Sequence, residues 1–201
     1  AGQSETIPAD RVLLSIGRRP VSTGLGLETI GVYTDRGAIV TDEHLRTNVP
    51  GVYAAGDVNG RSMLAHTAYR EAVNDMIGRP DRMRYHAVPA VIYTTPECAS
   101  VGETIETARE KGFEAKEVTV SMRYSGRYLA EVEGGDGICK LVVDTRASRL
   151  LGVHMIGSYA SEIIYGAALM VEHESKIDEL KEIIFPHPTV SEVIREALFE
   201  I

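Results

Sequence analysis

The segment His187-Pro188-Thr189-Val190-Ser191-Glu192 lies near the end of the chain, and a helical pattern follows it. Pro188 disfavours helical backbone at His187, so the imidazole is expected just outside that helix. Thr189 is predicted to be the N-cap, because apolar residues recur behind it at helical spacing: Val193, Ile194, Ala197 and Leu198. The segment therefore places a histidine on a stiff leader, five residues before a carboxylate.

Two roles are open for Glu192. A carboxylate beside a histidine orients the ring, fixes its tautomer and stabilises its protonated form, as a general base requires. The same Thr-x-x-Glu spacing is a capping box, in which Glu192 accepts a hydrogen bond from the backbone N–H of Thr189. Spacing alone favours the cap, since such boxes are common helix starts. His187 alone could equally be a surface residue in a turn between two prolines.

The pattern His-Pro-Thr-x-Ser-Glu close to a carboxyl terminus resembles the signature of the flavin-dependent (pyridine nucleotide) disulfide oxidoreductases. In that family the histidine is the catalytic acid/base and the glutamate is its partner. The resemblance therefore implies these roles for His187 and Glu192. It also implies a homodimer, formed through a carboxyl-terminal domain, in which the histidine motif reaches into the partner subunit's site.

The composition excludes several classes of protein. A length of 201 residues allows one large or two small domains. The formal net charge of −8 argues against nucleic acid and anionic membranes as partners, because both attract basic surfaces. No apolar run approaches the roughly 20 residues of a spanning helix, and the polar residues 1–10 do not resemble a signal peptide. We therefore expect a cytoplasmic location.

The two cysteines predict neither a metal site nor a redox centre. Cys98 and Cys139 lie far apart, which suits a reducing compartment, and the sequence has no cysteine and histidine cluster with metal-ligand spacing. Cys98 is expected to be a small buried residue, since no basic residue close in sequence would lower its pKa.

Residues 11–17, Arg-Val-Leu-Leu-Ser-Ile-Gly, form a nearly continuous apolar run, which predicts a buried strand of a parallel sheet. With the following Arg18-Arg19-Pro20, the run resembles the closing strand of the family's nicotinamide-binding domain, and residues 1–22 are assigned to the end of that domain. Because the chain opens on such a strand and without Met, we expect a fragment of a longer protein. The sequence then predicts a crossing at 21–31, with a helical turn near 27–30, and a short strand at 37–41.

The second informative stretch runs from Thr47 to Asp57, Thr-x-x-Pro-Gly-Val-Tyr-Ala-Ala-Gly-Asp. It predicts a turn at Pro50-Gly51 and a small-residue strand at 52–55, with Asp57 at the strand's carboxyl end, where open α/β sheets bind ligands. A tight Gly-Asp turn explains the same residues without any ligand. The stretch resembles the family's second flavin motif, which implies that Asp57 accepts a hydrogen bond from the ribityl chain of FAD and that Gly56 allows close backbone approach.

A helix is predicted at 67–77, with Gly78 as its C-cap and Pro80 beyond. A helix start carries free N–H groups and partial positive charge. In the family this start faces the pyrimidine edge of the flavin, so the resemblance implies cofactor contacts from the backbone of Met63, Leu64, Ala65 and His66. The His66 side chain is expected to pack or lie at the surface. Residues 23–83 are assigned to the carboxyl-terminal part of the FAD-binding domain.

Residues 84–201 resemble the interface (dimerisation) domain of the family. The fold class is therefore α+β, an antiparallel sheet flanked by helices, preceded by a partial α/β FAD/NAD-binding segment. Apolar residues at helical spacing give one helix a core stripe: Ile163, Ile164, Ala167, Ala168 and Val171. The predicted elements are two short strands within 87–102, a helix at 103–111 capped by Thr104, a meander of strands at about 114–124, 138–144 and 150–156, a helix at 159–174 capped by Ser158 or Ser161, and a short helix at 178–184.

The resemblance also defines what the complete protein would do. It implies a dehydrogenase that uses FAD and NAD, converting dihydrolipoamide and NAD⁺ to lipoamide and NADH, because Phe185–Glu192 and Arg18-Arg19-Pro20 resemble bacterial dihydrolipoamide dehydrogenases. Lipoyl domains of 2-oxo acid dehydrogenase or glycine cleavage complexes are the implied partners. A glutathione reductase-like, NADPH-dependent enzyme shares the histidine motif and stays open, as does a non-catalytic dimerisation or scaffold protein.

The chain alone is expected to be inactive and to bind neither cofactor. It lacks the glycine motifs that bind FAD and the nicotinamide, because Gly24-Leu25-Gly26 has no third glycine in register and no suitable strand before it. It also lacks the redox-active cysteine pair, whose spacing and position Cys98 and Cys139 do not match.

Overall fold

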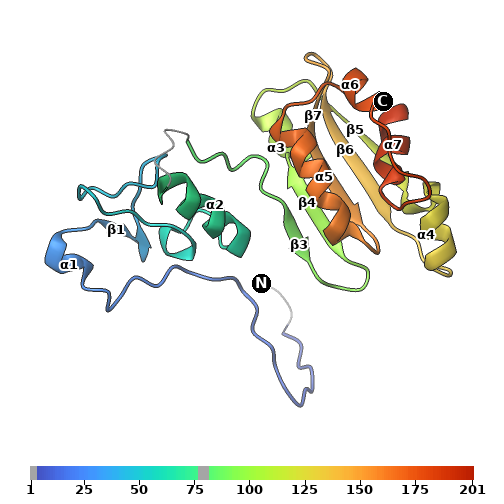
Figure 1. The fold of residues 1–201 in the computed structure, drawn as a ribbon. Coiled ribbons are helices and arrows are strands. Elements are labelled where there is room, and N and C mark those ends of the chain that lie inside the picture. The colour runs from blue at the N-terminus through green and yellow to red at the C-terminus, as the bar shows by residue number, and fades with distance from the viewer. Residues whose placement is uncertain (1–3, 77–81) are drawn as a thin grey trace. The chain divides into compact units, whose positions relative to one another are not determined.

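A computed structural model describes residues 4–76 and 82–201, which belong to two compact units, Ala1–Met83 and Arg84–Ile201 (Figure 1). Each unit is described by itself. Within the described ranges, no helix has both the length and the apolar character needed to cross a bilayer.

The first unit begins with an irregular segment. Residues 4–26 form no helix and no strand, so the strand predicted at 11–17 is wrong for this chain. Val12, Leu13, Leu14 and Ile16 are 76–91% exposed. A buried strand needs neighbouring backbone for its hydrogen bonds and apolar layers over its side chains. The described part of the unit supplies neither to this segment.

A small apolar core holds the rest of this unit together. Helix α1 (Leu27–Ile30) forms where the helical turn was predicted. The strand predicted at 37–41 is shorter, because β1 (Thr34–Asp35) and β2 (Ala38–Ile39) make a hairpin across Arg36-Gly37. Both turn residues have positive φ, as a tight two-residue hairpin requires. Val32, Ile39 and Ala54 form one buried cluster, and Leu45 is also fully buried.

The strand predicted at 52–55 is also wrong, since only a single bridge joins Tyr53 to Arg46. The carbonyl of Val52 is taken by the N–H and hydroxyl of Thr47, which closes a turn there. Gly56 then leaves the extended region altogether, with φ 82° and ψ −160°. Strand pairing therefore does not extend beyond the bridge between Arg46 and Tyr53, and Asp57 follows a loop instead of a strand.

Two helical elements complete the first unit, the short 3₁₀ helix η1 (Asp57–Asn59) and α2 (Ala65–Met76). Helix α2 confirms the predicted helix, although it begins two residues before the predicted start at Thr67. The predicted C-cap Gly78 and the proline at 80 lie outside the described residues.

The second unit is built on one antiparallel sheet of five strands in the order β3-β4-β7-β6-β5. The predicted meander is confirmed, as are the two short strands before it. The strands are β3 (Ala90–Ile92), β4 (Cys98–Gly102), β5 (Ala115–Ser121), β6 (Ile138–Asp144) and β7 (Arg149–Ile156).

Helices cover both faces of this sheet (Figure 1). Helices α5 (Ala160–Glu172) and α7 (Glu192–Phe199) pack on the face that carries Leu141 and Val153. The short helix α3 (Ile105–Glu110) covers the opposite face through Val142 and Leu151. Alternate residues of β6 and β7 thus point into different cores, as the two-residue period of a strand requires. Helix α3 has Thr104 as its N-cap, as predicted.

The predicted stripe of α5 is buried along its whole length, but its predicted serine caps are wrong. Tyr159 occupies the N-cap position in left-handed backbone, and the free N–H of Ser161 donates to Oε2 of Glu97 at 2.9 Å. A carboxylate 64 residues away in the sequence therefore does the work expected of a neighbouring hydroxyl.

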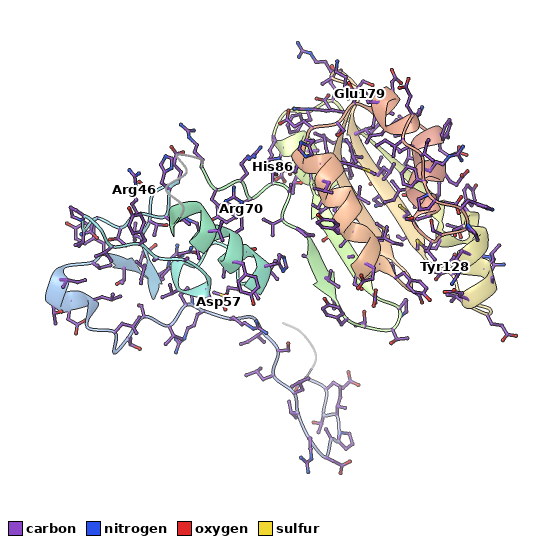
Figure 2. The ribbon with its side chains drawn as sticks, in the orientation of Figure 1. Arg46, Asp57, Arg70, His86, Tyr128 and Glu179 are labelled. Atoms are coloured by element: carbon purple, nitrogen blue, oxygen red, sulfur yellow. The ribbon has the colours of Figure 1, made fainter. Side chains whose placement is uncertain are left out.

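Three further helical elements differ from the elements predicted from the sequence. The short helix η2 (Met122–Tyr124) replaces the end of the strand expected at 114–124, and α4 (Gly126–Glu131) follows it. Helix α4 was not predicted; the Tyr128 side chain that anchors it is labelled in Figure 2. Helix α6 (Ile177–Lys181) is shorter than the helix expected at 178–184.

Candidate functional site

The structure brings the two predicted catalytic side chains into contact. Nδ1 of His187 lies 2.9 Å from Oε1 of Glu192, within hydrogen-bond distance. The second carboxylate oxygen, Oε2, accepts the backbone N–H of Thr189 at 2.8 Å. Both roles considered for Glu192 are therefore present in the geometry, one on each oxygen. The His187–Pro188 peptide bond is cis.

The predicted N-cap at Thr189 is wrong. Helix α7 begins at Glu192, with Ser191 at the N-cap position. The hydroxyl of Thr189 donates back to the carbonyl of Pro186 at 2.7 Å and lies 2.8 Å from Oγ of Ser191. It therefore closes the turn around His187.

The charge of Glu192 determines which tautomer the ring adopts. The backbone N–H of Thr189, and then the His187 ring, hold the pKa of this carboxyl below its usual range. An ionised carboxylate only accepts hydrogen bonds, so Nδ1 of His187 must carry the hydrogen between them. Nε2 of a neutral ring is then left as the basic nitrogen.

The imidazole is open to solvent, whereas its partner is largely enclosed. The His187 side chain is 79% exposed and that of Glu192 only 17%. A groove of about 490 Å³ runs beside this loop, lined by Pro188–Ser191 on one side and by Arg127, Tyr159 and Gly166 on the other. The ring is thus fixed at its inner nitrogen and accessible at its outer one, an arrangement that suits proton transfer to an external molecule.

The flavin-motif residues lie in the first unit, where a buried carboxylate organises them. Glu71 of α2 is fully buried and accepts the N–H of Gly56 at 2.5 Å and Nδ2 of Asn59 at 2.9 Å. These bonds tie the turn to the helix and leave Asp57, labelled in Figure 2, exposed at its tip. Sequence reasoning missed Glu71; a lone acidic residue within a helix gives no signal of burial.

The turn and the helix start fit the cofactor that the motif implies. Gly56 has a backbone conformation that other residues rarely adopt, and a Cβ there would lie 3.2 Å from Cβ of Ala68. Met63 and Leu64 are half-buried, while Ala65 and His66 are exposed at the first turn of α2. An exposed carboxylate suits a ligand with hydroxyls, and the partial positive charge at a helix start suits an electron-rich ring edge.

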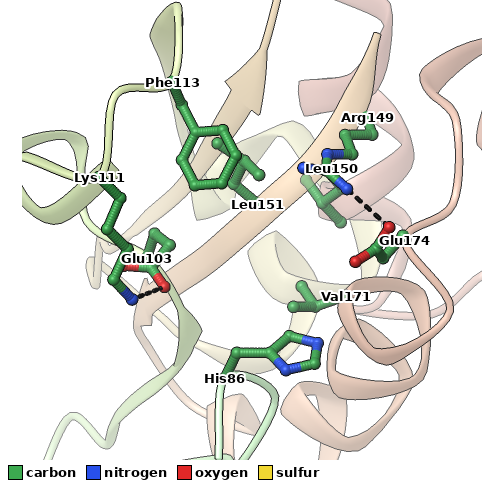
Figure 3. A pocket seen from close by; sticks show the side chains of 9 residues that line it. All are labelled: His86, Glu103, Lys111, Phe113, Arg149, Leu150, Leu151, Val171 and Glu174. Atoms are coloured by element: carbon green, nitrogen blue, oxygen red, sulfur yellow. Dashed lines mark hydrogen bonds and ion pairs between the residues drawn. The ribbon is translucent and has the colours of Figure 1, made fainter. Parts of the chain in front are cut away.

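A second pocket in the second unit, of about 220 Å³, has a different character (Figure 3). Two ion pairs border it: Lys111 with Glu103 at 2.5 Å, and Arg149 with Glu174 at 2.6 Å. Each cation already has a carboxylate partner, and the floor is apolar. These contacts brace the end of the sheet, and nothing in them selects a ligand.

The cysteines do not form a reactive centre. Both thiols are free, with Cys98 half-buried and Cys139 fully buried. Burial raises the pKa of Cys139 to about 12, so its thiol stays protonated and unreactive at neutral pH. Among the residues that the structure describes, no group of histidine, cysteine and acidic side chains is arranged to hold a metal ion.

Comparison with known proteins assigns both units. The dimerisation domain of the pyridine nucleotide-disulphide oxidoreductases matches residues 88–198, and the pyridine nucleotide-disulphide oxidoreductase domain matches residues 1–72. This chain belongs to the pyridine nucleotide-disulphide oxidoreductase family.

Its relatives in this family include several dihydrolipoyl dehydrogenases. The chain is 41% identical to that of Trypanosoma brucei brucei, over 98% of this chain and 42% of the relative. It is 38% identical to the mitochondrial dihydrolipoyl dehydrogenase of Pisum sativum, over 98% of this chain and 40% of the relative. The chain thus spans less than half the length of these curated relatives.

Solved structures of the family have the same fold. LpdA from Mycobacterium tuberculosis superposes with a TM-score of 0.84 at 28% identity, over 94% of this chain and 42% of that one. The HOCl-induced flavoprotein disulfide reductase RclA from Escherichia coli gives a TM-score of 0.80 at 26% identity, over 92% and 44%. The predicted fold class is confirmed.

Proposed function

We propose that this chain is the carboxyl-terminal part of a flavin-dependent disulfide oxidoreductase that converts dihydrolipoamide and NAD⁺ to lipoamide and NADH. His187 and Glu192 are its acid/base pair. The observation that carries the proposal is the 2.9 Å contact between Nδ1 of His187 and Glu192, on a ring that is open to solvent. The relatives named dihydrolipoyl dehydrogenase support the choice of substrate.

In this proposal Nε2 of His187 removes the proton from one thiol of the substrate. The thiolate so formed is the nucleophile in thiol–disulfide exchange, whereas the thiol is not. The proton then sits on the ring, where the ionised Glu192 stabilises the imidazolium. The carboxylate also prevents the ring from turning, because its second oxygen is fixed by the N–H of Thr189.

The first unit would hold the flavin through its turn and helix. Asp57 would accept a hydroxyl of the ribityl chain, close to Gly56, and the backbone from Met63 to His66 would face the flavin's ring edge. FAD and NAD, when bound, supply the acceptors for the electron pair removed from the dithiol. The redox-active cysteine pair is not provided by Cys98 and Cys139, so we expect the chain alone to be inactive.

A homodimer completes the proposal. The second unit matches a dimerisation domain, and the side chain of His187 is mostly exposed at its surface. We expect His187 to act at the site of the partner subunit. Lipoyl domains of 2-oxo acid dehydrogenase or glycine cleavage complexes are the expected protein partners.

The test uses the full-length enzyme with dihydrolipoamide and NAD⁺. Replacing His187 by Gln should lower kcat by about 10²–10⁴-fold, the usual contribution of general acid–base catalysis. His173→Gln is the matched control, since His173 is exposed at the carboxyl end of α5, away from the groove that borders the loop. Equal activity of the two variants and the wild type would refute the acid/base role.

Glu192→Gln tests the pairing itself. A glutamine has one acceptor oxygen, which the N–H of Thr189 would take, so its NH₂ group would face Nδ1 of His187. That contact forces the hydrogen onto Nε2 and disfavours the protonated ring. We expect kcat to fall. An unchanged kcat would show that Glu192 is a cap alone.

A further inference from the structure

The loop that carries His187 is held by a hydroxyl from a distant part of the chain. Oγ of Ser125 donates a hydrogen bond to the backbone carbonyl of Thr189 at 2.9 Å, across 64 residues of sequence. The N–H and hydroxyl of Thr189 are used within the loop, by Glu192 and by Pro186. The bond from Ser125 therefore ties the loop to the rest of the unit.

Ser125 is itself fixed in place. It is 1% exposed and forms the N-cap of α4, where its Oγ also accepts the N–H of Tyr128 at 3.2 Å. The residues around it are equally buried: Met122 is fully buried, and Tyr128 donates its phenol to the carbonyl of Asp136 at 3.1 Å. The Ser125 hydroxyl is therefore held by buried surroundings, and it both donates and accepts a hydrogen bond.

The His187 side chain has no comparable support. It is mostly exposed, and its contact with Glu192 fixes the ring only relative to the loop. Where the loop stands relative to the sheet depends on Val190, which is buried in the core, and on the Thr189 carbonyl. A displacement of about 1 Å in a reacting group costs on the order of 10²-fold in rate.

We propose that Ser125 is a positioning residue for the His187–Glu192 pair. Its bond to the Thr189 carbonyl fixes the position of the imidazole relative to the rest of the second unit. This inference rests on the proposed function of His187. It assigns a role in catalysis to the N-cap of α4.

The test compares three substitutions in the full-length enzyme. Ser125→Ala removes both the cap and the bond to Thr189. Ser125→Asp keeps an acceptor for the N–H of Tyr128 but cannot donate to a carbonyl when ionised. Ser125→Thr retains both functions. We expect Ala and Asp to lower kcat by about ten- to hundredfold with little change in KM, and Thr to restore most of the rate.

A cap elsewhere in the same unit provides the matched control. Thr104 caps α3 at the same distance, accepting the N–H of Thr107 at 3.2 Å, from an exposed position on the other face of the sheet. Thr104→Ala should lower thermal stability and leave kcat unchanged. If Ser125→Asp is as active as the wild type while Ala is slow, the hydroxyl is only a cap and the inference fails.

The outcomes also separate this inference from the function beneath it. Wild-type kcat in every Ser125 variant, with His187→Gln slow, overturns the positioning role and leaves the acid/base role intact. Full activity of His187→Gln overturns the proposed function itself. A slow Ser125→Ala whose pH–rate profile keeps its wild-type shape supports positioning, because the ring's proton chemistry is then unaltered and only its placement has changed.

Discussion

The two units of this chain treat apolar sequence in opposite ways. In the second unit every strand of the sheet pairs within the unit, and the central strands β6 and β7 are buried on both faces. In the first unit an equally apolar run, 11–17, lies exposed, and the buried core is limited to a few residues around Val32 and Ile39. An apolar pattern specifies a strand only where neighbouring backbone is present to pair with it.

The largest expected difference between the units is in amide hydrogen exchange. Amides of residues 12–16 should exchange on the order of 10³-fold or more faster than those of β6. Unpaired segments open at almost no free-energy cost, whereas core strands require unfolding worth about 5 kcal/mol or more. Mass spectrometry of exchanged peptides measures both at once. Protection of 12–16 comparable to that of β6 would break the comparison.

Two leucine substitutions compare the two units by their effect on the free energy of unfolding. Leu141 is fully buried in β6, so Leu141→Ala should lower the free energy of unfolding of the second unit by about 2–5 kcal/mol. Leu13 is 91% exposed, and Leu13→Ala should change stability by no more than about 0.5 kcal/mol. Urea denaturation followed by circular dichroism measures both. Similar losses would show that the apolar run at 11–17 is covered in solution.

The smallest expected effect concerns acid sensitivity of the second unit. The pKa of Glu192 is lowered in the fold by the N–H of Thr189 and by His187. Its contribution to stability is therefore present above the unfolded value, about 4.3, and is lost as pH falls through the lower folded value. The stability gap between wild type and Glu192→Gln should be larger at pH 6 than at pH 3. Denaturation across this range measures it, and a constant gap would contradict the lowered pKa.

Most of the second unit could be predicted from sequence because its signals are local. The meander follows from runs of β-branched and apolar residues, and the α5 stripe follows from helical spacing. Two contacts of this unit that were not predicted involve distant partners. Glu97 caps α5 and Ser125 holds the Thr189 carbonyl, each across 64 residues, and no local pattern announces such contacts.

The candidate site was predictable in part for the same reason. His187 and Glu192 lie five residues apart, so their contact depends on one turn that the sequence describes well. The predicted N-cap at Thr189 failed because its hydroxyl closes that turn instead. In the first unit, the strand expected before Asp57 failed because Gly56 and Thr47 end the extended backbone, and Glu71 was invisible without the fold.

The divided carboxylate of Glu192 has a consequence for how this segment can change over time. One oxygen accepts the N–H of Thr189 before α7, and the other contacts the imidazole of His187. A replacement for Glu192 must therefore make both contacts with one side chain. A descendant that lost its chemistry would still be under pressure to keep the glutamate for the helix. Retention of this glutamate in an inactive homologue would therefore be no sign of retained catalysis. Only retention of the histidine would indicate it.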